Sequence, residues 1–157
     1  MTEPAGTGAQ TEEPSQSDQI RTDEPVRDDT EVQPFLDRYA RALIAGDAAT
    51  IAQMWETPAL VVADQSVKVV ASGAEVETFF TGAAEQYTAR GITATRADIV
   101  WFDQATDRAV LVQVRWPHLD KEGKELGEEV TTYTLRRADS GDFKIRAVVM
   151  HGVAGTH

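Results

Sequence analysis

Apolar side chains recur at intervals of three and four residues from position 32 onward, which is the spacing of one face of a helix. The stripe consists of Val32, Phe35, Leu36, Tyr39 and Leu43. Thr30 has the capping-box spacing, and Gly46 can close the helix. Asp47 can then cap a short second helix that ends at Pro58. The pattern therefore predicts two consecutive helices, and Tyr39 lies on the apolar side of the first.

Residues 59–71 contain two short β-branched runs on either side of Asp64-Gln65-Ser66, a pattern that predicts a β-hairpin. Ser72 begins a second segment with capping-box spacing, and a second apolar stripe follows before Gly91. This stripe consists of Val76, Phe79, Phe80, Ala83 and Tyr87. A third helix is therefore expected between Ser72 and Gly91.

After residue 91 the apolar pattern changes from helical to alternating. Strands are expected near residues 92–103, 107–118, 127–138 and 142–151, separated by short polar turns. Short turns join antiparallel neighbours. The predicted fold class is therefore α+β, with three N-terminal helices packed on a strongly curved antiparallel β-sheet.

Composition divides the chain into two parts. Residues 1–30 are rich in Pro, Gly, Ser, Thr and acidic side chains, and we predict a disordered acidic tail there. Residues 31–157 form the predicted domain. The net charge of −11 disfavours binding to nucleic acid or anionic membranes. With no membrane-length apolar run and no signal-peptide pattern, we expect a cytoplasmic protein.

Residue types exclude several kinds of chemistry. The chain has no cysteine, which removes thiol catalysis, disulfides and cysteine-ligated metals. Helical HxxxH or HExxH pairs, glycine-rich phosphate loops and a GxSxG elbow are also missing from the sequence. We therefore expect neither a metal site nor a cofactor.

The order of these elements resembles the NTF2-like superfamily, a cone-shaped fold that includes ketosteroid isomerase and the SnoaL-like polyketide cyclases. The resemblance rests on "FLDRYARALIAGD", "IAQMWETPALVVAD", "EVETFFTGAAEQY" and "YTLRRADSGDFKIRAVV", and it covers roughly residues 31–151. It implies a cavity between the first helix and the concave face of the sheet. It does not by itself imply one function, because this fold carries many.

The resemblance also implies roles for individual residues. Tyr39 matches the helix-borne tyrosine that helps to stabilise an oxyanion in ketosteroid isomerases. Asp64 falls within one residue of the catalytic aspartate of that family, and a one-residue offset reverses the face of a strand. The second oxyanion donor of that family is an aspartic acid, where this chain has Thr132 or Tyr133.

Histidines and aromatic residues supply the other candidates. His151 shares parity with Phe143 and Ile145 and is expected on the core face, whereas His118 precedes a turn where a solvated histidine is common. Alternation places His118 on the same strand face as Trp116 and places Arg115 on the other face. The candidates for lining a pocket are Trp55, Tyr87, Trp116, His118 and Tyr133.

Two functional hypotheses follow. In the first, a small apolar or aromatic molecule binds in an internal pocket, with SnoaL-like acid/base chemistry in which Asp64 or His151 moves a proton and Tyr39 holds an oxygen. In the second, the domain is a non-catalytic interaction module whose cavity is filled. The resemblance also implies a homodimer through the outer face of the sheet, where Val148 and Met150 are expected.

Overall fold

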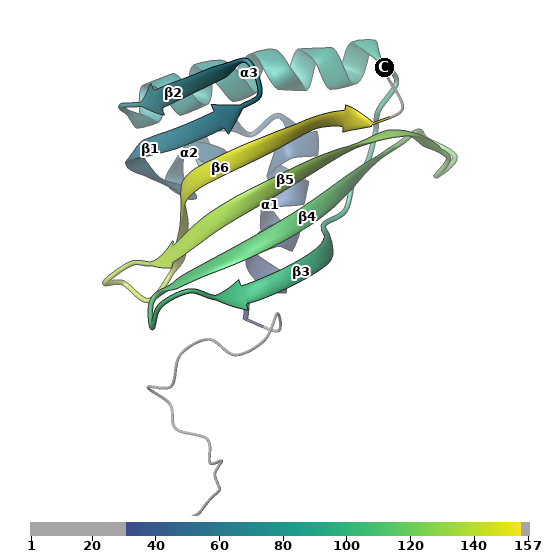
Figure 1. Ribbon diagram of the computed structural model, residues 1–157. Coiled ribbons are helices and arrows are strands. Elements are labelled where there is room, and N and C mark those ends of the chain that lie inside the picture. Colours follow the sequence, from purple (N-terminus) through teal and green to yellow (C-terminus); the bar gives the residue numbers. More distant parts are fainter. Residues whose placement is uncertain (1–30, 155–157) are drawn as a thin grey trace, which may run out of the picture.

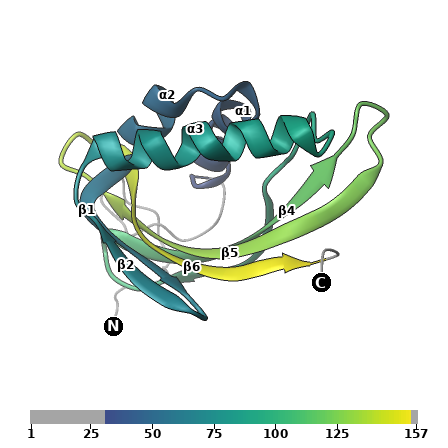
Figure 2. The ribbon, with the colours of Figure 1, turned by 90° about the horizontal axis from the view of Figure 1, so that it is seen from above.

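The computed structural model describes residues 31–154, and the predicted N-terminal tail lies outside them. Within the described residues, three helices lie over the concave face of a curved six-stranded sheet (Figures 1 and 2). The helices are α1 (Gln33–Ala45), α2 (Ala48–Gln53) and α3 (Gly73–Ala89). The strands are β1 (Trp55–Ala63), β2 (Ser66–Val70), β3 (Asp98–Gln104), β4 (Ala109–Leu119), β5 (Glu125–Arg137) and β6 (Phe143–Ala154).

The sheet is mixed, so the prediction of an antiparallel sheet is wrong for one pair of neighbouring strands. The strand order is β2-β1-β6-β5-β4-β3, and β1 runs parallel to β6 while the other neighbouring pairs are antiparallel. The four C-terminal strands form the expected meander. The hairpin of β1 and β2 pairs with β6, the last strand of this meander, and not with β3, its first strand. This long-range pairing creates the parallel contact.

Helix α1 has the predicted apolar face. Its whole predicted stripe is buried, and Gly46, the C-cap residue that follows Ala45, adopts a left-handed φ of 70°. The capping box predicted at Thr30 begins outside the described residues, and the N-cap Val32 makes no side-chain capping bond. Gln33 ties α1 to the segment before β3, because its Nε2 donates to the Ala97 carbonyl oxygen at 3.1 Å.

Local capping signals place the other two helices. Asp47 accepts a hydrogen bond from the Thr50 amide, as predicted, but α2 ends at Gln53 rather than near Pro58. Trp55 therefore begins β1, and Pro58 lies within that strand. Ser72 accepts from the Glu75 amide as predicted.

The last strand, β6, contains an irregularity that reverses its two faces. Leu135 pairs with Ile145, whereas the neighbouring Thr134 pairs with Ala147, so β6 has one extra residue at this point. Ile145 is fully buried on the concave side, and beyond the bulge it is Val148 that faces inward. The prediction that Val148 and Met150 lie on the outer face is therefore wrong, because both line the concave side.

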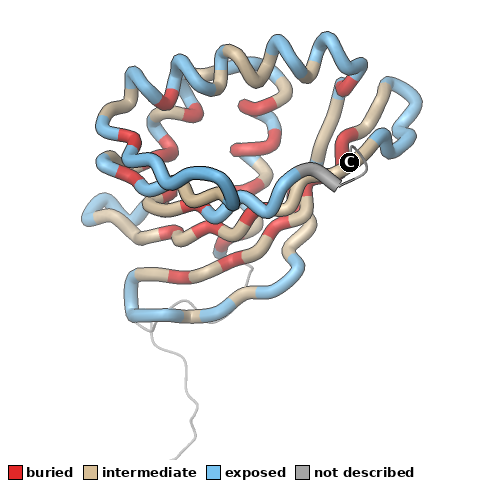
Figure 3. The backbone as a smooth tube through the Cα atoms, turned by 45° about the horizontal axis from the view of Figure 1, so that its top comes forward, coloured by how far each residue is buried: buried red, intermediate tan, exposed pale blue. Residues whose placement is uncertain are grey.

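Burial follows the layers of the fold. Buried positions alternate along the central strands and gather on α1, whereas α3 and the β1–β2 hairpin are mainly half-buried or exposed (Figure 3). Phe80 is only partly buried, and Phe79 is 58% exposed, although both belong to the predicted apolar stripe of α3. This stripe therefore does not close onto a filled core.

Candidate functional site

An open cavity of about 540 Å³ lies between α3 and the concave face of the sheet. Its walls come from α1, α3 and the strands β1, β2, β4, β5 and β6. Seven aromatic side chains line it: Tyr39, Trp55, Phe79, Phe80, Tyr87, Trp116 and Tyr133. A volume of this size is typical of small-molecule sites with apolar walls.

Tyr39 lines this cavity and is also part of the core. Only 2% of it is exposed, and its hydroxyl oxygen accepts a hydrogen bond from the Trp55 indole Nε1 at 3.1 Å. Burial raises the pKa of Tyr39 well above its usual value, and the nearby Tyr133 raises it further. The phenol therefore stays protonated at neutral pH.

Tyr133 on β5 repeats this arrangement from the sheet. Its hydroxyl accepts from the Trp116 indole Nε1 at 3.1 Å, and its ring lies 6.2 Å from that of Tyr39, centre to centre. Burial raises its pKa as well. The structure thus brings together four of the predicted residues, Tyr39, Trp55, Trp116 and Tyr133, as two indole–phenol pairs that face one cavity.

Glu129 is an ionisable residue of this cavity that the sequence analysis missed. It lies on β5 directly opposite Trp116 on β4 and lines the cavity wall. Burial raises the pKa of its carboxyl group, and the positive charge of Arg90 partly offsets this rise. Its parity with Tyr133, four positions later on the same strand, was the signal that would have placed it on the concave face.

His118 is buried, contrary to the expectation that it is solvated at the end of a strand. It is 1% exposed, its ring lies 5.7 Å from that of Tyr87, and it sits behind the cavity wall rather than in it. Neither ring nitrogen has a hydrogen-bond partner within residues 31–154. Burial, and secondarily Arg90, lower the pKa of His118, so the imidazole is neutral at neutral pH.

Asp64 and His151 are not brought to the cavity. Asp64 is exposed in the turn between β1 and β2, and the cavity wall there is formed by its neighbours Ala63 and Ser66. His151 is exposed and contacts the Thr132 hydroxyl at 2.8 Å. The prediction that His151 reaches the core face is wrong, because the bulge in β6 reverses the parity on which it depended.

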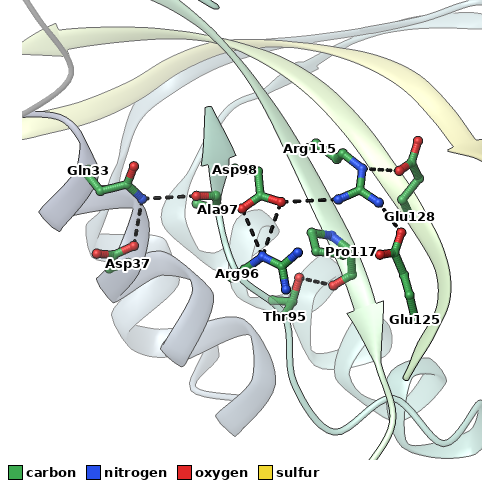
Figure 4. Close-up of polar contacts among 10 residues, drawn as sticks. All are labelled: Gln33, Asp37, Thr95, Arg96, Ala97, Asp98, Arg115, Pro117, Glu125 and Glu128. Carbon is green, nitrogen blue, oxygen red and sulfur yellow. Dashed lines mark hydrogen bonds and ion pairs between the residues drawn. The ribbon is translucent and has the colours of Figure 1, made fainter. Parts of the chain in front are cut away.

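The outer face of the sheet carries a charged cluster around Arg115, on the opposite side of β4 from Trp116, as predicted. Arg115 binds Asp98 at 3.2 Å and also contacts Glu125 and Glu128 (Figure 4). These contacts join β3, β4 and β5, and they compensate the positive charge of Arg115. Ion pairing between neighbouring strands therefore explains why these charged side chains gather on the outer face.

Two further features concern residues 31–154 only. No group of three or more histidine or acidic side chains there is placed to hold a metal ion. None of the helices in this range combines the length and the apolar character needed to cross a membrane.

Solved structures define the class of fold. A protein with a cystatin-like fold from Nostoc punctiforme superposes with a TM-score of 0.62 at 13% identity, covering 79% of this chain and 76% of that one. Aln2 from a Streptomyces species gives 0.60 at 19% identity, covering 77% and 87%. A ketosteroid isomerase-like protein from Erwinia carotovora gives 0.55 at 10% identity, covering 80% and 97%. At these identities the likeness establishes the fold alone.

A match to a sequence family places the chain among NTF2-like proteins. Residues 28–153 match the family described as NTF2-like protein (DUF6841), and the chain belongs to that family. The resemblance inferred from the sequence is therefore confirmed. No curated protein matches the chain in sequence.

Proposed function

We propose that this domain binds a small, mainly apolar or aromatic molecule that carries an oxygen acceptor such as a carbonyl group. One observation carries the proposal: two protonated tyrosines, each hydrogen bonded through its hydroxyl to an indole, line one open cavity with aromatic walls. The open volume favours this reading over an interaction module with a filled cavity. Because Tyr39, Asp64 and His151 do not converge, the proposal is one of binding and includes no reaction.

The two indole–phenol pairs favour donation of a hydrogen bond to the ligand. An indole N–H can only donate, so the Tyr39 and Tyr133 hydroxyls are the acceptors of these contacts. Each hydroxyl keeps its own proton, and the indole contact orients the phenol. A ligand carbonyl oxygen can accept from one hydroxyl or from both.

A matched pair of ligands tests the proposal. Acetonaphthone and ethylnaphthalene have similar shapes, but only the ketone has an oxygen acceptor. We expect the wild-type protein to bind the ketone roughly tenfold more tightly in isothermal titration calorimetry, because one or two neutral hydrogen bonds are gained. Y39F and Y133F should each reduce this preference and leave the binding of ethylnaphthalene nearly unchanged. If neither compound binds the wild-type protein, the pocket proposal fails.

We also propose that the domain forms a homodimer through the outer face of the sheet, at residues other than those predicted. Leu60, Val67, Val69 and Val149 are 39%, 68%, 61% and 42% exposed, and we call them the outer-face patch. They are contiguous, because Leu60 pairs with Val69 while Val62 pairs with both Val67 and Val149. Exposed apolar side chains gathered on one surface favour contact with a second copy.

Substitutions in the patch test the homodimer. The wild-type chain is expected to elute as a dimer in size-exclusion chromatography with light scattering at tens of micromolar, and L60K/V69K as a monomer, since lysine disfavours an apolar interface. V100K is the control, because Val100 is 55% exposed on β3, away from the patch. A monomeric wild-type protein, or a dimeric L60K/V69K variant, would contradict the proposal.

A further inference from the structure

The cavity contains a carboxylate without a close cationic partner among the described residues. Glu129 lines the wall, and 28% of its side chain is exposed. Among the described residues, the nearest group that could carry a positive charge is the imidazole of His118, whose Nε2 lies 3.9 Å from Oε2 of Glu129. This distance is too long for a hydrogen bond. A charge held in a partly desolvated wall is costly unless it is paired.

Neither neighbouring base neutralises this carboxylate at close range. The buried imidazole of His118 is neutral at neutral pH, because burial and Arg90 lower its pKa. Arg90 is exposed at the C-terminal end of α3, and within residues 31–154 it forms no ion pair with Glu129. Arg90 itself lines the cavity, as does Lys68, but among the described residues neither forms an ion pair with Glu129, so this carboxylate has no close counter-charge.

Aromatic side chains surround the same position. Trp116 is the direct cross-strand neighbour of Glu129, and both line the cavity. The negative charge of Glu129 contributes to the raised pKa values of Tyr87 and Tyr133, so both phenols lie within its electrostatic range. Aromatic faces attract cations, above all when water is excluded.

We infer that, among ligands of the proposed class, the cavity prefers those that also carry a protonated amine, with the ammonium group at Glu129 and the apolar body against the aromatic walls. This inference names the ligand class of the cavity and therefore rests on the proposed function. The ammonium group supplies the close counter-charge that Glu129 lacks among the described residues, and the net charge of −11 favours the approach of cations over anions.

A second pair of ligands tests this inference. Naphthylmethylamine is protonated at neutral pH, and naphthylmethanol is its uncharged counterpart of nearly the same shape. In calorimetric titrations at moderate salt, we expect the wild-type protein to bind the amine roughly ten- to a hundredfold more tightly than the alcohol, the range of a charge-assisted hydrogen bond. E129Q preserves the shape of the side chain and should remove this preference while alcohol binding is retained.

The chain offers a matched control for the effect of charge alone. Glu75 also lines the cavity, but one of its carboxylate oxygens accepts a hydrogen bond from the Ala71 amide at the start of α3. E75Q removes the same charge from the cavity wall and should keep the preference for the amine. Equal losses in E75Q and E129Q would mean that the cavity responds only to total charge, and the inference would be overturned.

The outcomes separate the inference from the proposed function. If the alcohol binds and the amine binds no better, the cavity is a ligand site and the inference about amines is wrong. A preference for the amine that persists in E129Q overturns the inference as well. If neither compound binds the wild-type protein, both the proposed function and the inference fail.

Discussion

Replacement of Leu135 by Ala is expected to lower the free energy of unfolding by about 3 to 4 kcal/mol. Leu135 is fully buried on β5, and its cross-strand neighbours Val110 and Ile145 are fully buried too. The truncated side chain would leave a void that a central strand cannot close, because pairing on both sides holds the backbone in place. Urea denaturation followed by circular dichroism measures the effect.

Leu126 provides the control on the same strand. It is 40% exposed, so L126A should change the free energy of unfolding by only about 0.5 kcal/mol. A comparable loss of stability in both variants would mean that the core does not centre on the inner face of β5.

Replacement of Val148 by Asp is expected to cost about 3 kcal/mol, because it places a carboxylate in the apolar wall beyond the bulge of β6. Val148 is 5% exposed, whereas its neighbour Val149 is 42% exposed on the outer face. V149D introduces the same residue, aspartate, at the adjacent position. Aspartate is a poor strand former at both positions, so the difference in stability between the two variants isolates the effect of side-chain orientation.

Strict alternation along β6 predicts the opposite order, with V149D the more harmful substitution. Thermal unfolding of both variants distinguishes the two registers. The comparison should be made at several protein concentrations, because Val149 belongs to the outer-face patch and its substitution also weakens the proposed dimer. A larger loss in V149D at every concentration would contradict the bulge described here.

The parts of the fold that follow from short-range rules could be read from the sequence. Ser72 and Asp47 are capping residues whose partners lie three positions away, and Gly46 adopts the left-handed conformation that ends a helix. The opposite orientations of Trp116 and Arg115 follow from simple alternation along one regular strand. In each case the determining interaction lies within a few residues of the chain.

Features that depend on distant partners could not be read in this way. The parallel contact of β1 with β6 joins segments about 90 residues apart, as the Arg146–Glu56 ion pair illustrates. The bulge near Ala147 is invisible in an apolar pattern, and it displaced three predictions at once, for Val148, Met150 and His151. Glu129 is a different case, because its parity with Tyr133 on β5 does indicate the concave face, but a glutamate in a polar strand segment is commonly solvent-facing.

The positions of the three tryptophans make the two faces of the sheet optically separable. Trp55 and Trp116 line the cavity, and their indole N–H groups are hydrogen bonded to tyrosine hydroxyls, whereas Trp101 is 42% exposed on β3. A ligand that competes for either hydroxyl would change the emission of a cavity indole directly. In a W101F variant, the remaining intrinsic fluorescence would come from the cavity alone, so occupancy could be followed without a label.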